Sequence, residues 1–239
     1  MTRPSVVLFD LDDTLFAHSA AVSAGVRAHR AAVGGAIAGA DEATELARWT
    51  ALEELHYHRY LRGEIGFDDQ RRERMRGFVA PFGLEFSDDE ALVWYWAYVE
   101  HYRAAWAIHE DAIGCLDAMP GVRFGIITNG ELAFQLPKLE AIGLLPRIEH
   151  VIASGDLGVA KPDPRIFAHA CNLFGVAGSD AVYVGDRFET DAVGAASAGL
   201  TGVWVDRLGV AGIGEQRVAV ASGILIVPSL AEVPGVLGF

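Results

Sequence analysis

The sequence predicts an α/β fold, in which a doubly wound parallel sheet carries a helical insertion. Short runs rich in Val, Ile and Phe alternate with helical patterns over most of the 239 residues, which is typical of a parallel sheet with helices on both faces. The alternation stops once, directly after the first run, where residues 16–112 contain no strand pattern. We therefore expect a Rossmann-like core built from residues 1–15 and 113–239, interrupted by a helical domain over residues 16–112.

Six apolar runs have strand length and are expected to form the sheet. They are Ser5–Phe9, Arg123–Thr128, His150–Ala153, Ala181–Gly185, Gly202–Val205 and Ile224–Val227. Helical patterns separate most of them. These are Glu131–Ile142, Pro164–Phe174, Thr190–Ala198 and Ser229–Val236.

The insertion reads as helices because its apolar and aromatic residues recur at three-to-four spacing. The pattern is clearest in Ala43–Tyr60 and Ala91–Ile108, with polar turns around Gly63–Gly66 and Pro81–Ser87. We interpret the aromatic residues as the core of a helix bundle. The charged run Asp68–Arg76 is interpreted as a solvated helix face.

Composition limits the classes of partner. With 19 basic and 32 acidic residues the net charge is −13, which argues against a groove for a nucleic acid polymer. Two cysteines in no CxxC pair suggest no disulfide framework. Aspartates interrupt the N-terminal apolar run, unlike a secretory signal, and charged residues interrupt the apolar stretch Ala91–Trp106. We expect a cytoplasmic monomer or homodimer without a membrane partner.

Polar residues follow several predicted strands. Asp10 and Asp12 follow the first strand, and Asp186 follows the fourth. Ligands of open parallel sheets bind beyond the carboxyl ends of the strands, so these three carboxylates are expected to lie together. Like charges that close need a cation or a shifted pKa. Mg²⁺ is expected, because it is held by one or two carboxylates together with water and substrate phosphate.

These residue types suit phosphoryl transfer. Asp10 can attack phosphorus as a carboxylate, and Asp12, two residues on, can donate and accept the proton. The Thr128 hydroxyl and backbone amides, including that of Asn129, can bind phosphoryl oxygens. Lys161 supplies a compensating positive charge, and proline after it restricts its backbone.

Only two of the 19 basic residues are lysines, Lys138 and Lys161. Lys161 lies between the third strand and a helix that Asp163 is expected to cap and Pro164 to begin. Lys138 lies inside a predicted helix, and we interpret it as a product of composition bias without a special role.

Four ordered motifs resemble those of the haloacid dehalogenase-like superfamily. They are DLDDT at Asp10–Thr14, ITN at Ile127–Asn129, Lys161 in VAKPDPRIF, and GDRFETD at Gly185–Asp191. Together they span nearly the whole chain. The resemblance implies a phosphatase of the branch with an α-helical cap that closes over the site and selects the substrate.

The resemblance also implies roles for individual residues. Asp10 would be the nucleophile, and Asp12 the general acid/base and a metal ligand through its backbone carbonyl. Asp186 would bind the metal, with Asp191 supporting the site. The implied activity is Mg²⁺-dependent hydrolysis of a small phosphorylated metabolite, of nucleotide, phosphoglycolate or sugar phosphate type, through an aspartyl-phosphate.

Other activities occur on the same fold. A haloacid dehalogenase needs neither the acid nor the metal, so Asp12 favours phosphoryl transfer. A phosphonate hydrolase would use a lysine of the cap, and both lysines lie outside the inferred cap. A phosphosugar mutase stays open because it uses the same two aspartates. A catalytically silent binding module is a further alternative.

Overall fold

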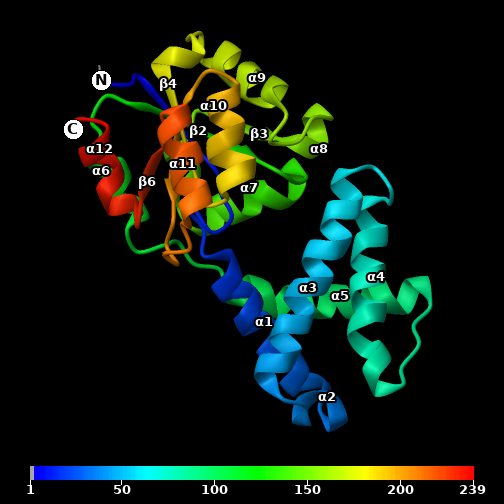
Figure 1. Ribbon diagram of the computed structural model, residues 1–239. Helices are drawn as coiled ribbons and strands as arrows, with labels where there is room; N and C mark the ends of the chain where they lie inside the picture. Colours follow the sequence, from blue (N-terminus) through cyan, green and yellow to red (C-terminus); the bar gives the residue numbers. More distant parts are fainter. Residues whose placement is uncertain (1–2) are drawn as a thin grey trace. The chain divides into compact units, whose positions relative to one another are not determined.

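A computed structural model describes residues 3–239 and contains a six-stranded, fully parallel sheet in the order β3-β2-β1-β4-β5-β6 (Figure 1). The strands are β1 Val6–Phe9, β2 Arg123–Thr128, β3 His150–Ala153, β4 Ala181–Gly185, β5 Thr201–Val205 and β6 Leu225–Val227. All six predicted strands are confirmed to within one residue. Met1 and Thr2, which the predicted core includes, lie outside the described residues.

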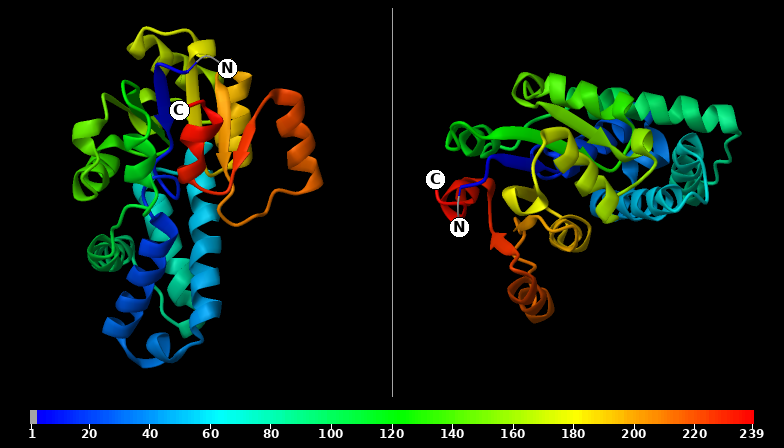
Figure 2. Two further views of the ribbon diagram at one scale, coloured as in Figure 1. Left: turned by 90° about the vertical axis from the view of Figure 1, so that its left-hand side faces the viewer. Right: turned by 90° about the horizontal axis from the view of Figure 1, so that it is seen from above.

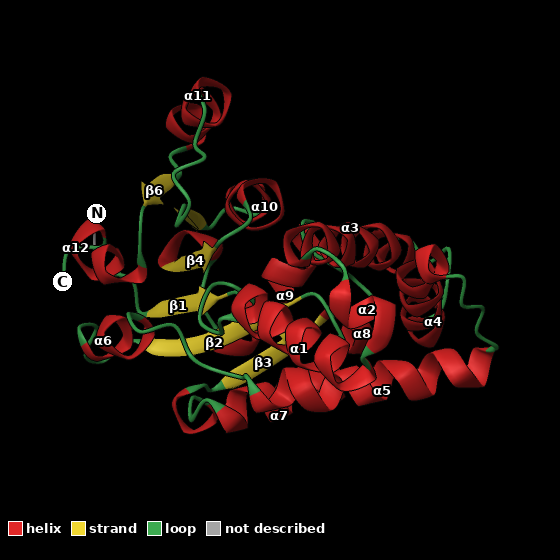
Figure 3. Cartoon of the chain, turned by 90° about the horizontal axis from the view of Figure 1, so that it is seen from below, coloured by secondary structure: helices red, strands yellow, loops and turns green. Residues whose placement is uncertain are grey.

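Both faces of the sheet are covered, as Figure 3 shows for the helices on its two sides. Val6 and Leu8 of β1 pack in one cluster with residues of α9 (Pro164–Phe174) and α10 (Gly194–Ser197). Val7 and Phe9 are equally buried and point to the opposite face, because side chains alternate along a strand. The doubly wound α/β prediction is confirmed.

The remaining core helices connect or flank the strands. They are α6 Ala112–Asp117, α7 Leu132–Ala141, α8 Ser154–Leu157, α11 Ile213–Ser222 and α12 Val233–Val236. Shorter turns are η2 Leu145–Arg147, η3 Gly178–Asp180, η5 Leu230–Glu232 and the π-helical turn η4 Phe188–Val193. The sequence did not predict α11, at the β6 edge of the sheet (Figure 2), because it buries only Ala219 and shows no apolar face.

The described chain forms two compact units, one of residues 3–18 with Ala107–Phe239 and the other of Ser19–Trp106. The connecting segments account for these limits. Phe16 forms a bridge with Ile108, the Ala17 N–H donates to the Ala107 carbonyl at 2.9 Å, and the His109 N–H donates to that of Leu15 at 2.9 Å. The two segments pair with each other, and both belong to the core unit.

The helical unit is a bundle in which α3 packs on α4 and α4 on α5. Its helices are α1 His18–Val33, α2 Gly35–Gly39, α3 Glu42–Leu61, α4 Phe67–Val79, η1 Ala80–Phe82 and α5 Asp88–Ala104. Trp49 and Tyr98 are buried and their ring centroids lie 4.4 Å apart, so the aromatic core is confirmed. Within residues 3–239, every helix is too short or too polar to cross a membrane.

The charged run Asp68–Arg76 is helical but not simply a solvated face. Arg71 and Arg74 are buried in the bundle. The Arg74 guanidinium forms an ion pair with Glu53 of α3 at 2.8 Å, and that of Arg71 lies over the Phe67 ring at 4.0 Å. The interpretation was wrong for these two residues because arginine can bury its stem and guanidinium where a carboxylate and aromatic rings receive them.

Candidate active site

Sheet order brings the predicted site residues to one edge. β1 lies between β2 and β4, with Phe9 in register with Ile126 on one side and Val184 on the other. The residues that follow these positions, including Asp10 and Asp186, therefore emerge at the same carboxyl edge, as expected for a ligand site of an open parallel sheet.

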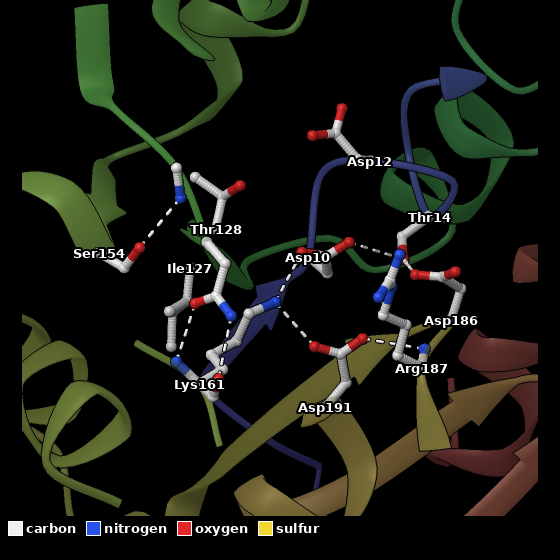
Figure 4. A network of polar contacts seen from close by, with 12 residues as sticks. Asp10, Asp12, Thr14, Ile127, Thr128, Ser154, Lys161, Asp186, Arg187 and Asp191 are labelled. Atoms are coloured by element: carbon white, nitrogen blue, oxygen red, sulfur yellow. Dashed lines mark hydrogen bonds and ion pairs between the residues drawn. The ribbon is translucent and has the colours of Figure 1, made fainter. Parts of the chain in front are cut away.

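Lys161 lies at the centre of a buried polar network (Figure 4). Its ammonium Nζ donates to Asp10 Oδ1 at 2.6 Å, to Asp191 Oδ1 at 2.7 Å and to Tyr183 Oη at 2.7 Å. All three of its protons are thereby used. Burial opposes the charge, but the two carboxylates outweigh it and raise the pKa of Lys161 above its ordinary value. Lys161 is therefore a permanent cation beside Asp10.

The backbone of Lys161 is held by Asn129. The Asn129 amide donates from Nδ2 to the Lys161 carbonyl at 2.9 Å and accepts the Lys161 N–H at Oδ1 at 2.8 Å. Asp163 then caps α9 by accepting the Arg165 N–H at 3.0 Å, as predicted. The Asn129 side chain thus holds the backbone of Lys161. The group of Asn129 that is left to donate to a phosphate is its backbone N–H.

Asp191 reaches the network from the π-helical turn η4. Its Oδ2 accepts the Arg187 N–H at 2.9 Å while its Oδ1 faces Lys161. A Cβ on Gly185 would lie 2.5 Å from the Asp191 side chain. Glycine at the end of β4 is therefore what lets Asp191 fold back against the strand.

Three carboxylates gather beside Lys161. Among the described residues, oxygens of Asp10, Asp186 and Asp191 lie within 4.8 Å of one another, as a metal site requires. The Thr14 hydroxyl lies between Asp10 Oδ2, at 3.4 Å, and Asp186 Oδ1, at 3.3 Å. Asp191 takes the place of the predicted Asp12 in this cluster, with its Oδ1 facing Lys161 and its Oδ2 accepting the Arg187 N–H. Each of the three carboxylates offers an oxygen to a cation at this position.

The electrostatics of the cluster support a cation. Burial, together with Asp191, raises the pKa of Asp10 to about 7 despite Lys161. Burial and then Asp10 raise the pKa of Asp186 to about 8. In both groups burial contributes most to the shift, and neighbouring carboxylates add to it. A divalent cation with oxygen ligands would balance the charge of these buried carboxylates.

The Asp12 carboxylate turns away from this cluster (Figure 4). Its Oδ1 forms an ion pair with Lys138 Nζ at 2.7 Å, and its Oδ2 accepts a hydrogen bond from Gln135 Nε2 at 3.0 Å. Burial works against ionisation here, but Lys138 and then His18 hold the pKa of Asp12 well below its usual range. The prediction that the Asp12 side chain joins Asp10 and Asp186 was wrong, because a second lysine competes for it.

Lys138 is the residue that the sequence interpretation missed. It is 2% exposed, and its partner is a predicted site residue, so the interpretation as composition bias was wrong. The scarcity of lysine was the available signal. This signal applied equally to Lys138 and Lys161. The role of Lys138 becomes visible only from its neighbours in the folded structure.

A family model described as haloacid dehalogenase-like hydrolase matches residues 4–199. The chain belongs to the haloacid dehalogenase-like hydrolases. Among curated relatives in sequence, the glyceraldehyde 3-phosphate phosphatase of Methanopyrus kandleri is 32% identical over 84% of this chain and 83% of its own.

Other haloacid dehalogenase-like relatives match only part of the chain. The phosphoserine phosphatase of Thermus thermophilus is 44% identical over 36% of this chain, and the human N-acylneuraminate-9-phosphatase 36% identical over 46%. These matches span 35% and 46% of the two relatives' own lengths.

Solved structures show the same fold. The putative hydrolase YfnB of Bacillus subtilis, bound to magnesium, has a TM-score of 0.81 at 18% identity, with each chain fully covered. The L-2-haloacid dehalogenase of Xanthobacter autotrophicus has a TM-score of 0.71 at 21% identity, covering 99% of this chain and 98% of its own. At these identities the likeness concerns the fold alone, and dehalogenases share it.

Proposed function

We propose that the protein is a Mg²⁺-dependent phosphatase that hydrolyses a small phosphomonoester through an aspartyl-phosphate on Asp10. The observation that carries the proposal is the pairing of Asp10 with the buried Lys161 at 2.6 Å, with Asp186 beside them. A nucleophilic carboxylate, a fixed cation and a second carboxylate for a metal are the groups that phosphoryl transfer to an aspartate requires.

In the first step, an Asp10 oxygen bonds to phosphorus while the bond from phosphorus to the ester oxygen breaks. Asp12 gives that leaving oxygen a proton which it first takes up from solvent, because the ion pair with Lys138 keeps it ionised at rest. In the second step, water attacks the acyl phosphate, returns a proton to Asp12 and releases inorganic phosphate and free Asp10. The positive charge of Lys161 would face the phosphoryl oxygens, which the Thr128 hydroxyl and the backbone amide of Asn129 would bind.

Asp10 and Asp186 would hold Mg²⁺, with the Asp12 backbone carbonyl as a further ligand and Asp191 as support. The bound cation would neutralise the charge of the phosphoryl group and of its two carboxylate ligands. This assignment follows the resemblance of the motifs, and it is supported by the gathering of the Asp10, Asp186 and Asp191 oxygens within 4.8 Å of one another.

The substrate class is proposed from the relatives. Those named above act on small phosphorylated metabolites, namely glyceraldehyde 3-phosphate, phosphoserine and N-acylneuraminate 9-phosphate. We propose a substrate of this size, and we propose that the helical unit, expected over residues 16–112 and found over Ser19–Trp106, acts as the cap that selects it. We further propose a cytoplasmic location, since such substrates are found there.

Release of inorganic phosphate from a panel of phosphomonoesters tests this function. We expect turnover of at least one member, complete loss of turnover with EDTA, and recovery when Mg²⁺ is added back. Isomerisation of a sugar phosphate without phosphate release would indicate a mutase instead. Turnover that ignores both EDTA and Mg²⁺ would contradict the proposed metal chemistry.

Stabilisation by Mg²⁺ is expected to depend on pH. The pKa values of Asp10 and Asp186, about 7 and about 8, exceed those of an unfolded chain, so between about pH 4 and pH 8 the folded state binds more protons. The metal-free protein should therefore lose stability as pH rises through this window. Mg²⁺ must displace these protons, so its apparent affinity should rise by up to about tenfold per pH unit for each proton displaced.

Thermal melts with and without Mg²⁺, at about pH 6 and about pH 8, measure this dependence. We expect the larger increase in melting temperature at the higher pH. The Asp186→Asn variant should lose most of the increase at both values. An equal increase at both pH values, or one retained in Asp186→Asn, would place the cation elsewhere.

A further inference from the structure

Helix α7 directs two buried polar side chains at the first motif. Gln135 and Lys138 are 3% and 2% exposed and lie three residues apart, on neighbouring positions of one helix face. Neither belongs to the residues assigned above to binding or proton transfer. A buried ammonium and a buried amide both carry a large desolvation cost, so their partners indicate what they are for.

Lys138 meets Asp12 across 126 positions of sequence, with Nζ 2.7 Å from Oδ1. Its ammonium also lies over the Phe16 ring at 5.1 Å and the Phe134 ring at 5.6 Å. The aromatic rings and the helix enclose the lysine. Lys138 is therefore not a surface charge. Its anionic partner is Asp12.

Gln135 connects two motifs. Its Nε2 donates to Asp12 Oδ2 at 3.0 Å and to Thr128 Oγ1 at 2.8 Å. Because Thr128 accepts this bond, its own hydroxyl proton is free to point at a ligand. The Asp12 carboxylate sets which way the amide faces, since the opposite orientation would bring two oxygens together.

This orientation of the Gln135 side-chain amide has an energetic cost. Gln135 Oε1 is buried and finds no hydrogen-bond partner among residues 3–239. An unsatisfied buried carbonyl opposes folding. A leucine would fill similar space without that cost, so the two bonds from Nε2 are what a glutamine at this position supplies.

We propose that Gln135 and Lys138 are positioning residues that orient the Asp12 carboxyl group and the Thr128 hydroxyl for the phosphoryl transfer proposed above. The inference rests on that proposed function. Asp12 must present one oxygen to the ester oxygen in the first step and to water in the second, and Thr128 must present its proton to the phosphoryl group. Both groups are tied to α7 and hence to each other.

Comparing two substrates with different leaving groups distinguishes a loss of Asp12 orientation from a general disruption of the active site. The p-nitrophenolate ion leaves without a proton, whereas the alkoxide of β-glycerol phosphate needs the proton from Asp12. In Gln135→Leu we expect kcat/KM to fall at least about tenfold more for the alkyl ester than for the aryl ester, a part of the 10²–10⁴-fold that a positioned acid contributes. Asp12→Asn should show the same preference more strongly.

Gln216→Leu is the matched control, because it makes the same exchange on the exposed helix α11. It should match the wild type on both esters. An equal loss on both esters in Gln135→Leu would indicate a structural role and overturn the proposal. Melting curves establish that each variant is folded.

The action of Lys138 through Asp12 is tested by removing the lysine in a background that already lacks the Asp12 carboxylate. Asp12→Asn/Lys138→Met should have the same activity as Asp12→Asn within about threefold, because residues that act through one another are non-additive. A further loss of tenfold or more would mean that Lys138 acts independently of Asp12 and would overturn its part of the inference.

Failure of the phosphatase proposal itself gives a different result. In that case the wild type releases no phosphate from either ester, or Asp10→Asn retains the wild-type rate. A wild type that is active and an Asp10→Asn variant that is not, combined with equal losses in Gln135→Leu, would reject only the positioning role.

Discussion

Replacing Asp10 with asparagine is expected to abolish phosphate release, with a loss of at least about 10³-fold. The amide matches the carboxylate in shape but cannot attack phosphorus or form an acyl phosphate that water hydrolyses. Steady-state release of phosphate from the best substrate of the panel measures the loss. Substantial residual activity in a carefully purified sample would contradict the aspartyl-phosphate mechanism.

The same variant should remain folded. Lys161 keeps its ion pair with Asp191 at 2.7 Å, and the substitution removes a buried carboxyl whose pKa of about 7 shows that its charge is unfavourable there. We therefore expect an unchanged or higher melting temperature near pH 8. Asp117→Asn makes the same chemical change at an exposed position of α6, where it weakens only a surface ion pair with Arg147. It should leave activity unchanged and stability within about 1 kcal/mol, which makes it the matched control.

Replacing Lys161 with methionine is expected to remove activity and also to lower the free energy of unfolding by about 3–5 kcal/mol. The substitution leaves Asp10 and Asp191 buried and facing each other without their shared cation. The loss should be smaller near pH 5.5, where Asp10 takes up a proton that removes one of the two charges. Urea unfolding at the two pH values measures both effects.

A second variant separates stability from catalysis at this position. Lys161→Met/Asp191→Asn removes one of the facing carboxylates and should recover part of the lost stability, while activity stays absent because no cation faces the phosphate. If Lys161→Met unfolds like the wild type, the buried network contributes little to stability. If it retains activity, Lys161 is not required for phosphate binding.

Strand positions were predictable because buried parallel strands are continuous apolar runs, which local sequence reveals. The π-helical turn η4 was predicted only as an ordinary helix beginning near Thr190, and α11 was not predicted. In η4 the Asp191 side chain bonds to Lys161, 30 positions away in the sequence, and a local pattern does not reveal such a contact. In α11 only Ala219 is buried, so no apolar periodicity marks it.

Within the site, position along the strands was predictable and side-chain direction was not. Asp10, Thr128 and Asp186 lie at the strand ends where the order of motifs placed them. Asp12 is only two residues from Asp10, yet its carboxylate faces the other way because Lys138 and Gln135 attract it. No residue near Asp12 in the sequence indicates this direction of its side chain.

The sequence by itself determined the parallel sheet, the helical insertion and the alignment of four motifs with the haloacid dehalogenase-like hydrolases, because each depends on local patterns or on order along the chain. Only the tertiary structure decided which lysine pairs with which carboxylate. Lys161 meets Asp10 across 151 positions and Lys138 meets Asp12 across 126. A buried ammonium takes the acceptors that packing places within reach, and that placement is a property of the assembled sheet and helices.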